Sequence, residues 1–185
     1  MADPHAPAAA RTRSILVTGC SSGIGQNAAL GLRAHGWRVF ASCRREEDCA
    51  RLRAEGFESP RLDYADAASI EGALAEVLAA TGGTLDALFN NGGYGQPGAV
   101  EDLSRDMLRA QFETNVFGSL ELTNAVIPVM RRQGYGRIVQ NSSLLGFAAL
   151  PFRGAYIASK FALEGLYDTL RLELADTGIQ VALIE

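Results

Sequence analysis

The chain has 185 residues, of which 48% are hydrophobic and 21% charged, and its 17 basic and 21 acidic side chains leave a net charge of −4. This composition is typical of one soluble globular domain, large enough to bury a core without disulfides or bound metal. The mild acidity argues against a nucleic-acid binder, because the basic residues are scattered and only Arg44–Arg45 and Arg131–Arg132 are adjacent.

The cysteines and the ends of the chain bear on its compartment. Cysteines stand at positions 20, 43 and 49, an odd number without the Cys-x-x-Cys spacing of a zinc site. We therefore expect no metal and a reducing, cytoplasmic location. No apolar run approaches the ~20 residues that span a bilayer. Residues 1–13, rich in Ala and Pro, are expected to form a disordered leader.

From residue 14 onward, short apolar runs alternate with longer segments of helical period, which predicts a doubly wound α/β domain with a parallel sheet and three layers. The six expected strands are Ser14–Thr18, Trp37–Cys43, Pro60–Asp63, Leu85–Phe89, Gly136–Asn141 and Ile179–Ile184. No repeat or linker divides residues 14–185, so they are expected to form a single domain. The sequence ends directly after the last expected strand, without a turn or cap, and we interpret it as a fragment.

A glycine-rich loop follows the first expected strand. It reads Thr18-Gly19-Cys20-Ser21-Ser22-Gly23-Ile24-Gly25, and a helical segment comes next. Glycines here permit a tight turn and let backbone N–H groups approach a pyrophosphate at the helix N-terminus. The strand before and the helix after favour dinucleotide binding over a plain strand-to-helix turn.

Three residues could form a catalytic set. Tyr156 and Lys160 are four residues apart and so share one helix face, and Ser143 lies at the end of the fifth expected strand. Reduction of a carbonyl needs a hydride for carbon and a proton for oxygen, and a lone tyrosine exchanges protons poorly near neutral pH. A neighbouring ammonium favours the phenolate, and a serine hydroxyl can hydrogen-bond the substrate oxygen. The spacing alone also fits an ordinary pair on a helix surface.

Together these motifs resemble the short-chain dehydrogenase/reductase family, from about residue 14 to the last residue. Asn90-Asn91-Gly92-Gly93 is similar to that family's NNAG motif, and its third residue departs from Ala, which we expect to loosen the loop. Residues 156–166 are most similar to the branch of hydroxysteroid and retinol dehydrogenases and bacterial NADP-dependent aldehyde reductases.

The resemblance also assigns individual residues. It favours Ser143 over Ser142 as the catalytic serine, and it implies that Asn115 is a fourth catalytic residue, holding a water that links Lys160 to solvent. The alternative for Asn115 is an amide on a helix surface. The expected catalytic residues are Asn115, Ser143, Tyr156 and Lys160.

The end of the second expected strand bears on the choice of cofactor. NAD enzymes place an acidic residue there, whereas this chain has Cys43 followed by Arg44 and Arg45, which suit the 2′-phosphate of NADP(H). The alternative is that both arginines are solvated surface charges. The residues expected to bind the cofactor are Gly19, Ser21, Ser22, Gly23, Ile24, Gly25, Arg44, Arg45, Asp63, Tyr64, Asn90, Gly92, Tyr156 and Lys160, of which Asp63 and Tyr64 lie against the adenine by resemblance.

The expected substrate is a hydrophobic aldehyde, ketone or alcohol. Five apolar residues stand between the expected catalytic serine and tyrosine, at Leu144, Leu145, Phe147, Leu150 and Phe152. The alternative is that they pack the core. The resemblance further implies a homodimer or homotetramer, packed through helices near 103–132 and 154–177.

Two other functions stay open. Family members continue past the sixth strand with a segment that covers the substrate, so this chain could be an NADP(H)-binding module that does not turn over. A Rossmann-like methyltransferase also uses a glycine loop, but it has no need of the serine, tyrosine and lysine together.

Overall fold

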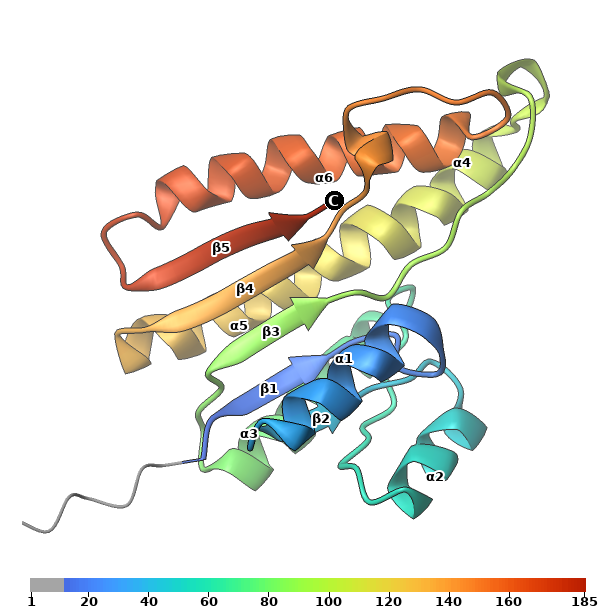
Figure 1. Cartoon of the computed structure of the whole chain (residues 1–185). Coiled ribbons are helices and arrows are strands. Elements are labelled where there is room, and N and C mark those ends of the chain that lie inside the picture. The colour runs from blue at the N-terminus through green and yellow to red at the C-terminus, as the bar shows by residue number, and fades with distance from the viewer. Residues whose placement is uncertain (1–11) are drawn as a thin grey trace, which may run out of the picture.

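A computed structural model describes residues 12–185 as a parallel sheet between two layers of helices (Figure 1). The strands are β1 (Ser14–Val17), β2 (Arg38–Ala41), β3 (Ala87–Asn90), β4 (Gly136–Asn141) and β5 (Ile179–Ile184). The helices are α1 (Gly23–Ala34), α2 (Glu46–Ala54), α3 (Ala67–Thr81), α4 (Arg105–Phe112), α5 (Ser119–Gln133) and α6 (Gly154–Glu173). The expected leader, residues 1–13, lies outside the described residues except for its last two. Within the described part of the chain, each helix is too short or too polar to cross a bilayer.

The sheet has the order β2-β1-β3-β4-β5, with every pair of neighbouring strands parallel. This confirms the expected doubly wound α/β fold. The strand order reverses between β1 and β3, and in such sheets ligands bind outside the carboxyl ends of the strands at this switch point. The loops that follow β1, β3 and β4 therefore converge at the place where a site is expected.

The core lies on both faces of the sheet because successive strand residues point to opposite sides. In β1, Leu16 packs with the buried residues of α3, α5 and α6, while Ile15 and Val17 pack with those of α1 and α2. All three side chains are buried. A strand covered on both faces reads as a continuous apolar run, which explains the sequence of β1.

The third expected strand, Pro60–Asp63, was a wrong prediction. Residues 58–63 lie beside β2 but form only two isolated parallel bridges, between Phe40 and Glu58 and between Cys43 and Arg61, and only the second falls within the expected strand. Pro60 stands between these bridges and has no N–H to donate to a ladder. The five strands in the described residues are therefore one fewer than expected.

The long helical stretch between β3 and β4 contains a π-helical turn that the sequence did not reveal. This turn, η2 (Glu113–Gly118), connects α4 to α5 and contains Asn115. A Cβ atom at Gly118 would collide with the backbone of Tyr64, so only glycine allows this close approach. Such π turns often lie at functional sites.

Candidate active site

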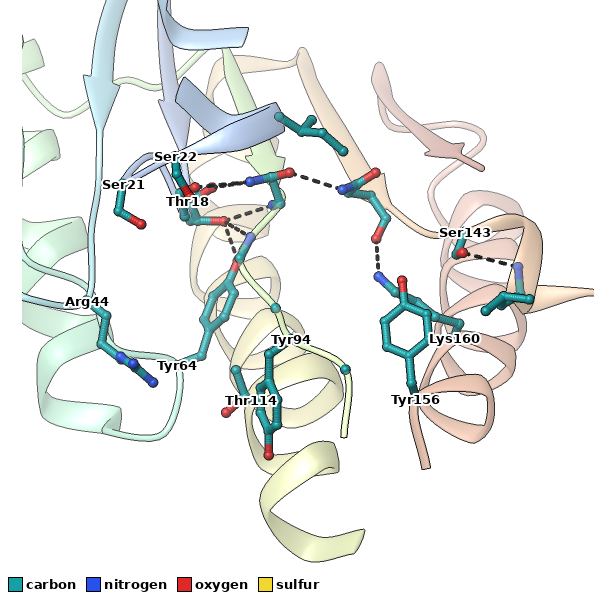
Figure 2. Close-up of a pocket in the computed structure, with 18 of the residues that line it drawn as sticks. Thr18, Ser21, Ser22, Arg44, Tyr64, Tyr94, Thr114, Ser143, Tyr156 and Lys160 are labelled. Atoms are coloured by element: carbon teal, nitrogen blue, oxygen red, sulfur yellow. Dashed lines mark hydrogen bonds between the residues drawn. The ribbon is translucent and has the colours of Figure 1, made fainter. Parts of the chain in front are cut away.

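A cavity of about 810 Å³ opens at the carboxyl edge of the sheet (Figure 2). Ser21, Ser22 and Arg44 lie at one end of it, and Ser143, Tyr156 and Lys160 lie at the other. The residues predicted from sequence that line it are Gly19, Ser21, Ser22, Ile24, Arg44, Asp63, Tyr64, Gly92, Ser143, Tyr156 and Lys160. The fold thus brings one end of the predicted cofactor site and three of the four predicted catalytic residues to a single cavity.

Five predicted residues are not among those that line the cavity: Gly23, Gly25, Arg45, Asn90 and Asn115. Gly25 lies so close to the carbonyl of Gly19 that a side chain would collide with it. Arg45 lies 3.4 Å from Glu47 on the surface. Asn90 is fully buried and donates to the Thr123 hydroxyl at 2.7 Å, so it connects the end of β3 to α5 behind the cavity wall.

The N-terminus of α1 has the features of an anion site. Its N-cap residue, Ser22, makes no hydrogen bond from its side chain to the helix, and the first turn contains no acidic residue. In contrast, α3 is capped by the Asp66 side chain, and the first turn of α2 holds three acidic residues. Free N–H groups and the positive end of the helix dipole favour a phosphate at α1.

The loop before α1 leaves room for a pyrophosphate close to its backbone. Gly19 has a φ of +69°, a conformation that favours glycine, and a Cβ atom there would lie 2.8 Å from the Cα of Gly92. The glycines therefore let the loops after β1 and β3 touch while the backbone N–H groups of α1 stay accessible. This backbone geometry fits the diphosphate of a dinucleotide cofactor.

Thr18 connects the same two loops by hydrogen bonds. Its hydroxyl accepts from the backbone N–H groups of Asn91 and Gly92, at 2.9 and 3.0 Å. It also lies 2.8 Å from the hydroxyl of Tyr64, which donates to Asn90 at 2.7 Å. One buried threonine thus satisfies two backbone donors at the cavity wall.

Gly92, the position that departs from the family motif, is explained by its neighbour Tyr64. A Cβ atom at Gly92 would lie 2.9 Å from the Cε2 atom of the Tyr64 ring. The ring fills the space that the methyl group of alanine would need. Burial raises the pKa of Tyr64, so its hydroxyl stays protonated as a donor within the core.

A chain of polar contacts runs from the glycine loop to the end of the cavity that holds Tyr156 and Lys160 (Figure 2). The Asn91 amide donates to the Thr18 carbonyl at 2.9 Å and accepts from the Asn141 side chain at 3.0 Å. Lys160 Nζ then donates to the main-chain carbonyl of Asn141 at 2.7 Å. Asn91 and Asn141 both line the cavity, and the sequence reasoning missed them.

The environment of Lys160 differs from that of an ordinary surface lysine. Its side chain is buried, and burial lowers its pKa from 10.5 to about 8, while the charge of Glu164 acts in the opposite direction. The ammonium lies 5.5 Å from the centre of the Tyr156 ring. Lys160 therefore holds a labile proton near neutral pH, beside the tyrosine.

The two adjacent serines after β4 have different surroundings. Ser143 lines the cavity, and its hydroxyl accepts from the backbone N–H of Leu145 at 3.1 Å. Ser142 is buried and donates to the carboxylate of Glu164. The geometry therefore favours Ser143 as the residue that meets a substrate.

Asn115 contacts the loop after β3 instead of the cavity. Its side-chain oxygen accepts from the Tyr94 N–H at 3.0 Å, and its nitrogen donates to the Tyr94 carbonyl at 2.8 Å and the Ser159 hydroxyl at 3.1 Å. The side chain holds this loop beside Tyr156, since a Cβ at Gly95 would lie 3.3 Å from the tyrosine ring. A catalytic role for Asn115 stays a prediction.

The end of β2 carries no acidic side chain toward the cavity. Cys43 is buried, and burial raises the pKa of its thiol to about 12. Arg44 follows and lines the cavity. The segment that follows β2 therefore carries a neutral thiol at Cys43 and an arginine next to it.

Comparison with known proteins agrees with this geometry. The family model described as short chain dehydrogenase matches residues 13–185, and the chain belongs to that family. It is 44% identical over 173 residues to the uncharacterized oxidoreductase YbbO of Escherichia coli (strain K12), a match that covers 94% of this chain and 64% of that protein. It is 37% identical over 185 residues to human retinol dehydrogenase 8, covering 96% of this chain and 59% of the relative. The chain thus spans less than two thirds of the length of these relatives.

Solved structures share the fold. A short-chain dehydrogenase from Streptomyces avermitilis matches with a TM-score of 0.91 and 39% identity, covering 96% of this chain and 66% of that one. A gluconate 5-dehydrogenase from Burkholderia cenocepacia, in complex with NADP and tartrate, matches with a TM-score of 0.82 and 30% identity, covering 92% and 70%. A short chain dehydrogenase/reductase from Burkholderia phymatum, in complex with NAD, matches with a TM-score of 0.87 and 29% identity. The match covers 93% of this chain and 64% of that one.

Proposed function

We propose that this chain forms the cofactor-binding and catalytic part of an NADP(H)-dependent oxidoreductase that interconverts hydrophobic carbonyl compounds and alcohols. The observation that carries the proposal is the shared cavity, with the uncapped N-terminus of α1 and Arg44 at one end and Ser143, Tyr156 and Lys160 at the other. Membership of the short chain dehydrogenase family supports a nicotinamide cofactor.

The preference for NADP(H) rests on charge at the end of β2. A 2′-phosphate is an anion, and a guanidinium can bind two of its oxygens at once through two parallel N–H groups. Arg44 lines the cavity, whereas Arg45 does not. The neutral thiol of Cys43 brings no negative charge against the phosphate. Since the structural neighbours include an NADP and an NAD complex, the preference depends on these residues of this chain.

The proposed chemistry needs three groups of the protein. A bound nicotinamide supplies or accepts the hydride. Tyr156 donates the proton to the carbonyl oxygen, Ser143 hydrogen-bonds that oxygen, and the Lys160 ammonium stabilises the phenolate that remains. With a pKa of about 8, Lys160 can also pass a proton onward near neutral pH.

An apolar substrate is supported by side chains at the catalytic end. Leu145 and Leu150 line the cavity beside the predicted catalytic residues. Leu144, Phe147 and Phe152 are exposed and do not pack the core, which was the alternative. The name of the human relative, retinol dehydrogenase 8, also fits an apolar substrate.

We also propose that the protein is a cytoplasmic homo-oligomer. Phe117 and Phe161 are about half exposed, at 52% and 49%, and both lie within the two helical regions expected to form the interface. The three free, buried cysteines suit a reducing compartment.

The experiment that tests the function is reduction of a panel of apolar aldehydes and ketones, followed by the consumption of NADPH. We expect Tyr156→Phe to abolish reduction while its Kd for NADPH stays within about twofold of the wild type, because the change removes one hydroxyl. Tyr135→Phe is the control, since Tyr135 precedes β4 at the opposite edge of the sheet. Binding of NADPH without reduction of any substrate would favour the binding-module alternative.

A further inference from the structure

Glu164 is a buried carboxylate on α6 that the proposed chemistry does not use. Only 8% of its surface is exposed, and its Oε1 atom accepts a hydrogen bond from the Ser142 hydroxyl. A charged residue is rarely buried without a specific partner, because burial of an unpaired charge is costly. The surroundings of Glu164 therefore call for a functional explanation.

Glu164 contacts both ends of the turn that carries the predicted catalytic serine. We call residues 142–146 the serine turn. At its start, Ser142 donates to Glu164, and at its end a Cβ atom on Gly146 would lie 2.9 Å from both Cγ and Oε1 of Glu164. Between these contacts, the Gly146 N–H donates to the Ser143 carbonyl at 2.7 Å. The position of Ser143 thus depends on a turn packed on one carboxylate.

The same carboxylate acts on Lys160. Residues four apart on a helix lie on the same face, so Glu164 is one turn from the catalytic lysine. Its negative charge raises the pKa of Lys160 and so opposes the effect of burial. Among residues 12–185, Glu164 is the charged side chain whose field acts on Lys160, and Tyr156 is the titratable neighbour on the same helix. From β4, the neutral main-chain carbonyl of Asn141 accepts a hydrogen bond from Lys160.

We propose that Glu164 is a positioning residue of the active site, which holds the serine turn through Ser142 and keeps Lys160 charged through its own negative charge. The effect of Glu164 on catalysis rests on the proposed function. The two structural parts of the proposal, the held turn and the charge on Lys160, can be measured without turnover.

The effect of Glu164 on the charge of Lys160 can be tested directly, because Lys160 is the only lysine among the 185 residues. Labelling of lysine side chains with ¹⁵N therefore gives a single ammonium signal, whose titration by NMR reports the pKa of Lys160. Glu164→Gln keeps the size and the acceptor oxygen but removes the charge, and we expect the midpoint to fall by on the order of one pH unit. The matched control is Glu173→Gln, the same change at an exposed position of α6. An unchanged midpoint in Glu164→Gln would overturn this part.

The held turn is tested with Ser142→Ala, which removes the donor and keeps the carboxylate. We expect the amide protons of Leu145 and Gly146 to exchange at least about tenfold faster than in the wild type, because the turn loses one of its two contacts with Glu164. The lysine titration in this variant should stay as in the wild type. Unchanged exchange at both amides would overturn this part of the proposal.

Turnover then links the two parts to the chemistry. If reduction needs the Lys160 ammonium, a midpoint lowered from about 8 to about 7 reduces kcat of Glu164→Gln at pH 8 about fivefold, measured at saturating NADPH. The decline of kcat with rising pH should begin at lower pH in the same variant. A wild-type chain that reduces no carbonyl would contradict the proposed function, while the titration and exchange results would still decide the role of Glu164.

Discussion

Lys160 Nζ donates a 2.7 Å hydrogen bond to the main-chain carbonyl of Asn141, the last residue of β4. The Asn141 side chain donates in turn to Asn91, which bonds the carbonyl of Thr18 at the start of the glycine loop. Lys160 is therefore connected to the glycine loop through the ends of three neighbouring strands. This arrangement fixes the distance between the two ends of the cavity.

Burial of Lys160 makes protein stability depend on pH. The pKa of Lys160 is about 8 in the folded protein against an ordinary value of 10.5, so the unfolded chain binds this proton more tightly. The cost of burying the charge is fully present below pH 8 and is relieved as pH rises toward 10.5. Relative to Lys160→Met, the wild type should gain up to about 3 kcal/mol in the free energy of unfolding across this range. Urea denaturation of both proteins at several pH values measures the difference, and parallel curves would refute the prediction.

Arg44 should decide between the two cofactors. Arg44→Ala is expected to weaken NADPH binding about tenfold or more, since charge-assisted hydrogen bonds contribute roughly 1.5–3 kcal/mol, and to leave the Kd for NADH nearly unchanged. Arg45→Ala is the matched control, because the neighbouring Arg45 does not line the cavity. Fluorescence titration of the wild type and both variants with each cofactor gives the six dissociation constants. Equal losses for both cofactors would show that Arg44 does not read the 2′-phosphate.

Gly92 and Tyr64 should be energetically coupled. Gly92→Ala places a methyl group 2.9 Å from the Tyr64 ring, and we expect it to destabilise the protein by about 1–3 kcal/mol. In a Tyr64→Leu background the same change should cost less, because the smaller side chain leaves room.

The control for this cycle is Gly31→Ala in α1, where a Cβ atom meets nothing within 4 Å. Alanine there should stabilise the protein by about 0.5–1 kcal/mol. Chemical denaturation measures every variant. A Gly92→Ala variant as stable as the wild type, or an equal cost of Gly92→Ala in both backgrounds, would contradict the account of this position.

The parts of the site that were predicted from sequence depend on local spacing. The glycine loop lies within eight consecutive residues, and Tyr156 and Lys160 share one helical turn, so their geometry follows from strand and helix periods. The position of Ser143 followed from the carboxyl end of a strand. Ser143, Tyr156, Lys160 and several residues of the glycine loop line the cavity.

The parts that were missed depend on contacts between distant segments. The Asn141 carbonyl that binds Lys160 belongs to the backbone, so no residue type signals it. The strand expected at 60–63 was wrong because the segment has only one apolar side chain besides proline, Leu62, and because Pro60 has no N–H to donate. The pairing of Ser142 with Glu164 spans 22 residues and becomes visible only when α6 packs beside the serine turn.

The most direct test of the central claim is a fluorescence titration of the 185-residue chain with NADPH and separately with NADH, with the folded state checked by circular dichroism. The account predicts that NADPH binds at least about tenfold more tightly than NADH, a difference of about 1.4 kcal/mol. Equal affinities would contradict the role of Arg44. Failure of the folded chain to bind either cofactor would contradict the assignment of this cavity as a dinucleotide site.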